Sequence, residues 1–89
     1  MLRALFLVQF HRDIDGQGQE ILRAVAVAFS QVKQIYLSKG SYEGVVFIEA
    51  ENEEEVRIVG GKISRMPDIA SVNPLRDLEA VPFKRNKGT

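Results

Sequence analysis

The fold is decided by one stretch in the middle of the chain, which reads Gly44-Val45-Val46-Phe47-Ile48-Glu49-Ala50-Glu51-Asn52-Glu53-Glu54-Glu55. Residues 44–50 are dense in β-branched and aromatic side chains, and an apolar run this short is typical of a strand. Asn52 then has the form of a helix N-cap, with Glu55 at the third helical position and negative charge in the first turn. The stretch therefore predicts a strand followed directly by a helix.

The helix that begins after Asn52 continues through an apolar stripe at helical spacing. Its members are Val56, Val59, Ile63 and Met66, and Pro67-Asp68 ends the pattern. Gly60-Gly61 lies inside the stripe, where each glycine costs about 1 kcal/mol relative to alanine. Either the helix is loose at this point or a neighbouring group approaches it closely.

The segments before this block predict a strand, a helix and a second strand. Residues 3–10 form the first strand, whose pleat places Phe6, Val8 and Phe10 on one side and Leu5, Leu7 and Gln9 on the other. Residues 18–29 have apolar side chains at helical spacing, and residues 32–37 form a β-rich run that ends in turn residues. The runs 32–37 and 44–50 are therefore expected to form a hairpin.

The end of the chain is less regular. Residues 69–72 are expected to form a short fourth strand, and residues 74–81 an irregular or single-turn segment anchored by Leu75, Leu78 and Val81. The order strand, helix, strand, strand, helix, strand predicts an α+β fold of the ferredoxin-like βαββαβ type. Such a fold has a four-stranded antiparallel sheet with two helices on one face. Residues 1–83 would form a single domain, and residues 84–89 a basic flexible tail.

One face of such a sheet is left open, but the pattern does not say which one. Val45 and Phe47 share one pleat side of their strand with Glu49, whereas Val46 and Ile48, which are equally apolar, share the other. A carboxylate such as Glu49 at the end of an apolar stripe either reaches solvent or meets a donor on a partner, for example a helix N-terminus.

The composition and charge of the chain exclude several classes of function. The 89 residues carry 12 Lys+Arg and 12 Asp+Glu, so no overall field attracts the chain to nucleic acid or an anionic membrane. Cysteine is absent, which excludes disulfide scaffolds, Cys-ligated zinc and thiol catalysis. No apolar run approaches the ~18 residues of a membrane span, and the N-terminus lacks a signal-peptide cleavage site. The chain is expected to be soluble and intracellular.

Each candidate calcium, nucleotide or catalytic motif lacks a residue that its chemistry requires. Residues 13–18 look like the opening of an EF-hand calcium loop, but its twelfth position is Ala24 where a bidentate Glu is required, and a strand precedes the loop. Gly16-Gln17-Gly18 lacks the third glycine of a dinucleotide site, since Ile21 stands there. His11 has no serine in a nucleophile context to activate. We therefore expect turns here, with no catalytic residue, metal or cofactor and no enzyme activity.

Several blocks, in order, resemble one known family. They are Leu5-Phe6-Leu7-Val8-Gln9, Gly18-Gln19-Glu20, Tyr42 to Ala50, Val56 to Gly60, and Pro74-Leu75-Arg76-Asp77-Leu78-Glu79-Ala80-Val81. They resemble the NGN domain of NusG-type transcription elongation factors, above all that of the large subunit of eukaryotic DSIF. The resemblance covers nearly the whole chain.

This resemblance implies a non-catalytic module of a transcription elongation factor that promotes processive elongation. A depression built by Leu7, Val45 and Phe47 would bind the clamp coiled coil of RNA polymerase. Glu49 would meet a helix N-terminus in the small zinc-binding subunit of DSIF, giving a heterodimer. Nucleic acid would be contacted weakly or indirectly. The location would be the nucleus if the eukaryotic resemblance holds, and the cytoplasm otherwise.

Two other classes share the βαββαβ plan. An ACT or Lrp-type small-molecule-sensing regulatory domain is the alternative, because Lys39-Gly40-Ser41-Tyr42-Glu43 looks like the Gly-x-Tyr-Asp hairpin of that class. An RNA-binding domain of this topology would need a pair of aromatic side chains on its central strands for base stacking, and Phe47 stands almost alone there.

Overall fold

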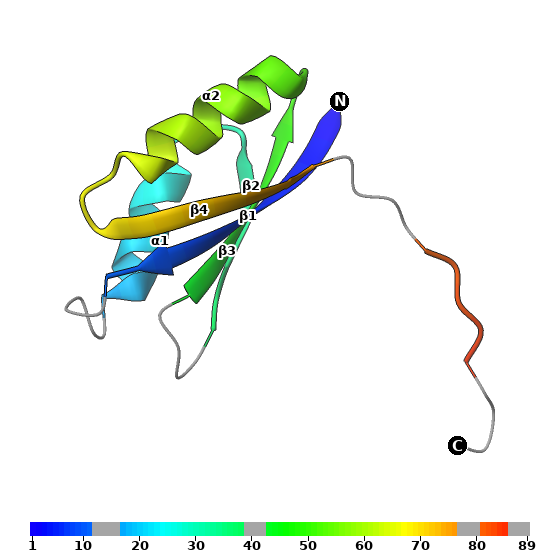
Figure 1. Ribbon diagram of the computed structural model, residues 1–89, viewed down its shortest axis with the longest axis horizontal. Helices are drawn as coiled ribbons and strands as arrows, with labels where there is room; N and C mark the ends of the chain where they lie inside the picture. The colour runs from blue at the N-terminus through cyan, green and yellow to red at the C-terminus, as the bar shows by residue number, and fades with distance from the viewer. Residues whose placement is uncertain (12–16, 39–42, 77–80, 86–89) are drawn as a thin grey trace.

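The computed structural model describes residues 1–11, 17–38, 43–76 and 81–85 (Figure 1). Its elements follow the predicted order: β1 (Leu2–Phe10), α1 (Gly18–Ala28), β2 (Val32–Leu37), β3 (Glu43–Ala50), α2 (Glu53–Ser64) and β4 (Ile69–Arg76). The ferredoxin-like βαββαβ fold is thereby confirmed.

The four strands form one antiparallel sheet in the order β2-β3-β1-β4. β1 lies in the middle, where Phe6 is paired with Val46 of β3 and Val8 with Val72 of β4. β2 and β3 form the predicted hairpin, so β2 and β4 are the two edges of the sheet. Both helices lie on the same side of the sheet (Figure 1).

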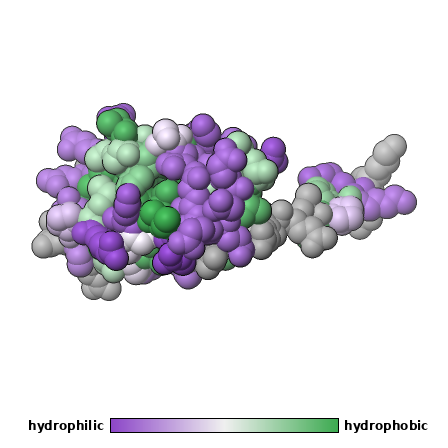
Figure 2. Space-filling model, turned by 90° about the horizontal axis from the view of Figure 1, so that it is seen from above, coloured by the Kyte–Doolittle hydropathy of each residue, from purple (hydrophilic) through white to green (hydrophobic). Residues whose placement is uncertain are grey.

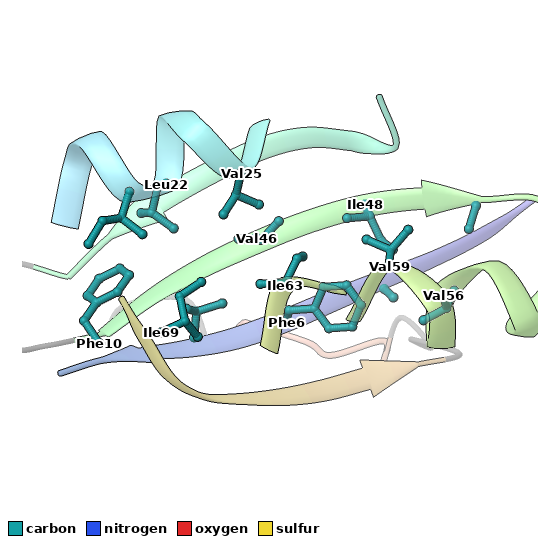
Figure 3. Packing of buried hydrophobic residues seen from close by; sticks show 14 residues of the cluster. Phe6, Phe10, Leu22, Val25, Val46, Ile48, Val56, Val59, Ile63 and Ile69 are labelled. Atoms are coloured by element: carbon teal, nitrogen blue, oxygen red, sulfur yellow. The ribbon is translucent and has the colours of Figure 1, made fainter. Parts of the chain in front are cut away.

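The hydrophobic core lies between the helices and one face of the sheet (Figure 3). Phe6 and Val8 of β1 and Val46 and Ile48 of β3 point into it, and each is at most 1% exposed. The helices supply Leu22 and Val25 from α1 and Val56, Val59 and Ile63 from α2. This packing answers the question that the sequence left open, because the helices cover the face that carries Phe6 and Val46.

Helix α2 begins as predicted. The Asn52 side chain accepts a hydrogen bond from the backbone N–H of Glu55 at 2.9 Å, and three glutamates occupy the first turn. Near the other end, Gly60 faces the core. A Cβ atom there would lie 3.1 Å from Cε1 of the Phe6 ring, whereas one at Gly61 would have nothing within 4 Å. The close neighbour expected from the glycine pair is therefore Phe6, and it approaches Gly60 alone.

The fourth strand differs from the sequence expectation. It extends to Arg76, so Pro74 and Leu75 belong to β4 and not to an irregular segment. A proline has no N–H to donate, but β4 is an edge strand and one of its sides needs no partner. Val81 is 79% exposed, so it does not anchor this end of the chain. The third expected anchor, Leu78, lies outside the described residues, as do the calcium-loop residues 13–16.

Candidate functional site: the open face of the sheet

The face of the sheet opposite the helices carries a continuous row of apolar side chains. Register places Leu5 opposite Phe47 and Leu75, and Leu7 opposite Val45, which is itself opposite Tyr36. Tyr36, Leu75 and Leu7 are 58%, 43% and 39% exposed. We call this set the open-face patch: Leu5, Leu7, Tyr36, Val45, Phe47 and Leu75.

Polar groups limit the open-face patch at both ends. At one end, Arg3 lies opposite Glu49, with 3.5 Å between Arg3 Nε and Glu49 Oε2. At the other end, the Ser71 hydroxyl donates a hydrogen bond to Gln9 Oε1 at 2.9 Å. An apolar centre with a polar rim is typical of a surface that binds another protein.

A hollow of about 260 Å³ lies at the Gln9 end of the open-face patch. We call it the open-face pocket; it is lined by Leu7, Val8, Gln9, Glu43, Ser71, Val72 and Asn73. Its side chains include a carboxylate, a hydroxyl and two amides. These groups can accept hydrogen bonds from an ammonium group and donate them to a carboxylate or carbonyl oxygen.

A second hollow, of about 230 Å³, lies between α2 and the edge strand β4. We call it the α2–β4 groove; it is lined by Phe6, Val56, Arg57, Gly60, Gly61, Ser64, Val72 and Pro74. Arg57 pairs with Glu54, its Nε donating to Glu54 Oε2 at 3.2 Å. This hydrogen bond, aided by the attraction between the two opposite charges, lowers the pKa of Glu54 and raises that of Arg57.

The structure places Leu7, Val45 and Phe47 side by side on the open face. Sequence reasoning missed three further members of the open-face patch, Leu5, Tyr36 and Leu75. Leu5 shares a pleat side with Leu7, which the sequence itself shows, whereas Leu75 requires the longer β4.

Glu49 has a partner within the chain. Its side chain is 30% exposed and paired with Arg3 across β1, so its carboxylate already faces a cation. The alternation of β1 puts Arg3 on the same pleat side as Leu5 and Leu7. That signal is present in the sequence, but only the register of β1 against β3 shows that the two charges meet.

The remaining candidate residues form no second site in the described part of the chain. His11 is exposed, and its backbone N–H donates to the carbonyl oxygen of Asp68 at 3.4 Å. Over the described residues, no three His, Asp or Glu side chains are grouped so that they could hold a metal ion. A search of the same residues finds no helix with the length and apolar character needed to cross a membrane.

No protein-family model matches the sequence, and no curated protein matches it either. Solved structures do match. TTHA0845 from Thermus thermophilus aligns with a TM-score of 0.74 at 23% identity, covering 93% of this chain and 100% of that one. AsnC from Escherichia coli aligns with a TM-score of 0.66 at 18% identity, over 94% of this chain and 55% of AsnC. The ACT domain from GTP pyrophosphokinase of Chlorobium tepidum gives 0.61 at 15% identity, over 84% and 97%.

These likenesses show the fold, which this chain shares with AsnC and with the ACT domain of GTP pyrophosphokinase. The resemblance to an NGN domain is wrong, because the structural likeness is to proteins such as AsnC and the ACT domain, and no NusG-type factor is among the matches. The physical reason lies in the blocks that carried the resemblance. In residues 44–50 the alternating side chains fill the core on one side and the open-face patch on the other, as any half-covered strand of this fold requires.

The functional and partner predictions that rested on the NGN resemblance are wrong with it. They are the role in transcription elongation, the RNA polymerase clamp bound through Leu7, Val45 and Phe47, and the zinc-binding DSIF subunit bound through Glu49. The structural observations beneath them remain: an exposed apolar patch and an ion pair at its end.

Proposed function

We propose that this chain is a non-catalytic regulatory domain of the ACT or Lrp type, which associates with a second copy through the open-face patch and binds a small polar effector. The open-face patch is the observation that carries the proposal. Tyr36, Leu75 and Leu7 are each more than one third exposed on a single sheet face. Their burial against another molecule would stabilise the complex through the hydrophobic effect.

A second copy suits this surface because a two-fold interface joins the same patch on both partners. The rim carries charges of both signs, Arg3 and Glu49, so a copy can meet itself without facing only like charges. Two sheets packed face to face lie about 10 Å apart with interdigitating side chains, which the apolar centre of the open-face patch would supply.

The open-face pocket is the proposed effector site. It lies beside Leu7 at the end of the open-face patch, so a second copy would close over it. The Glu43 carboxylate suits an ammonium group, and Gln9, Ser71 and Asn73 suit the oxygens of a small metabolite. We propose an amino acid or similar zwitterion as the ligand class.

The nuclear location depended on the eukaryotic resemblance, which is wrong, so we propose the cytoplasm, the other location expected from the sequence. Thermus thermophilus, Escherichia coli and Chlorobium tepidum are the sources of the similar structures, and bacteria have no nucleus. This location belongs to the proposal and follows from the regulatory domains that the fold resembles.

The self-association test compares the wild-type chain with the Leu7→Glu variant by light scattering over a range of concentrations. The wild-type chain should have the mass of a dimer at micromolar concentration, and Leu7→Glu should be a monomer because it places a charge within the apolar patch that the interface buries. Val27→Ser is the matched control, since Val27 is 88% exposed on α1, away from the sheet. A monomeric wild-type chain would refute the proposed interface.

The effector test is a thermal shift screen with single amino acids. A ligand at 100 times its Kd stabilises the folded state by about 2.7 kcal/mol, which raises Tm by several degrees in a domain of this size. Glu43→Gln should abolish the response and leave the dimer mass unchanged. A response that survives Glu43→Gln would place the ligand elsewhere.

A further inference from the structure

A second unpartnered apolar feature lies near the end of the chain. Residues 81–85 form an exposed segment in which Val81 is 79% and Phe83 78% exposed, and the Arg85 guanidinium lies 5.5 Å from the centre of the Phe83 ring. We call this segment the C-terminal arm. Figures 1 and 2 show it standing apart from the sheet and helices, and Figure 2 shows apolar and hydrophilic side chains together in it.

The α2–β4 groove has the size and lining to receive such side chains. Its volume of about 230 Å³ is below the ~300–1,000 Å³ usual for drug-sized ligands, which suits one or two amino-acid side chains. Phe6, Val72 and Pro74 line it with apolar surface. Gly61 adds open space, since a Cβ atom there would meet nothing within 4 Å.

The charges beside the groove complement those of the C-terminal arm. Helix α2 carries Glu53, Glu54 and Glu55 in its first turn, immediately before Val56, which lines the groove. Arg57 also lines the groove and is paired with Glu54, which leaves Glu53 and Glu55 for the basic residues of the arm. In the arm, Lys84 and Arg85 immediately follow Phe83. A strand or peptide that places Phe83 in the groove therefore brings its two basic residues close to these acids.

We propose that the C-terminal arm of one copy docks in the α2–β4 groove of a second copy, with Phe83 and Val81 in the groove and Lys84 and Arg85 toward the acids of α2. The proposal rests on the face-to-face dimer of the proposed function. Stacked sheets lie about 10 Å apart, and five residues can span at most roughly 17 Å, so Val81 can lie beyond the edge of the partner's sheet. Within one chain, by contrast, the arm points away from the rest of the domain (Figure 1).

Disulfide trapping between two different variants tests the exchange directly, because the natural sequence contains no cysteine. One chain carries Gly61→Cys, whose side chain enters open space, and the other carries Phe83→Cys. A disulfide forms when the Cα atoms are about 4.4–6.8 Å apart, so docking between copies should give a covalent heterodimer that reductant separates. The control pairs Gly61→Cys with Val27→Cys, which is also exposed but lies on α1, outside the lining of the groove, and should give no such product.

Three outcomes would overturn the arm exchange. The first is a wild-type dimer by light scattering with no crosslink between Gly61→Cys and Phe83→Cys chains, which leaves the proposed function intact. The second is a chain carrying both cysteines that closes only on itself as a monomer, which would place the arm in its own groove. The third is a monomeric wild-type chain with no crosslink, which removes the proposed dimer as well.

A binding measurement separates the apolar and charged parts of the docking. Phe83→Ser should raise the dimer Kd about tenfold or more, whereas the control Val27→Ser should leave it unchanged. Lys84→Glu with Arg85→Glu should also raise the Kd, and adding Glu53→Lys and Glu55→Lys should restore part of the affinity. A Kd that no arm substitution changes would refute the docking.

Discussion

The two faces of the sheet carry similar side chains but have different surroundings. On the covered face Phe6 is 1% exposed among residues of both helices, while on the open face its neighbours in sequence, Leu5 and Leu7, remain partly exposed. The same holds on β3 for Val46 and Phe47. Apolar character alone therefore does not distinguish a core position from a surface one. The apolar residues of the covered face stabilise the single chain, whereas those of the open face become useful when another molecule covers them.

Phe6→Ala against Phe47→Ala is the largest expected contrast between the faces. Removing a fully buried phenylalanine side chain costs about 3–5 kcal/mol, so Phe6→Ala should unfold the domain or lower its Tm greatly. Phe47→Ala should cost about 1 kcal/mol or less in a monomeric background such as Leu7→Glu, because its ring is already partly in water. Urea unfolding of both variants in that background measures the difference. Equal losses would mean that the two faces are buried to the same degree in solution.

Gly60→Ala and Gly61→Ala test the same contrast within two successive residues of α2. At Gly60 a new methyl group would meet the buried Phe6 ring at 3.1 Å, so we expect a loss of roughly 1 kcal/mol despite the better helix propensity of alanine. At Gly61 nothing lies within 4 Å, so alanine should stabilise the helix by about 0.5–1 kcal/mol. Chemical denaturation of the two variants measures whether each substitution raises or lowers the free energy of unfolding. Stabilisation by both substitutions would show that Phe6 can move away from α2.

Much of this contrast was accessible from the sequence, because alternation in residues 3–10 and 44–50 separates the two faces of each strand. The N-cap at Asn52 and the helical stripe after it also identified α2. What the sequence could not supply was the choice of the covered face, which depends on where two helices pack. The length of β4 was missed because Pro74 reads as a break, although an edge strand tolerates it. The family prediction was wrong because short apolar blocks of this kind occur in the strands of any sheet with the βαββαβ order.

The Arg3–Glu49 pair gives a smaller effect that also depends on the partner. In the monomer the Arg3 side chain is 71% exposed, so a double-mutant cycle with Arg3→Ala and Glu49→Ala should give a coupling energy of only about 0.2–1 kcal/mol. If a second copy covers the open face, water is excluded and the coupling measured on dimer formation should be larger. Unfolding in the Leu7→Glu background gives the coupling energy in the monomer. Dimer dissociation in the wild-type background gives the coupling energy on dimer formation. Equal values would mean that the ion pair lies outside the interface.

The smallest effect belongs to the exposed Arg57–Glu54 pair on α2, where the hydrogen bond from Arg57 lowers the pKa of Glu54. A carboxyl group whose folded pKa is depressed stabilises the fold above its unfolded pKa, and this contribution is lost as the pH falls through the folded value. NMR titration should show the pKa of Glu54 returning toward its ordinary value in Arg57→Gln. Because both groups are exposed, acid unfolding should hardly change. The opposite result is a pKa of Glu54 that Arg57→Gln leaves unaltered but that falls as the protein concentration rises through the dimer Kd. That result would mean that cations of a second copy, and not Arg57, lower this pKa.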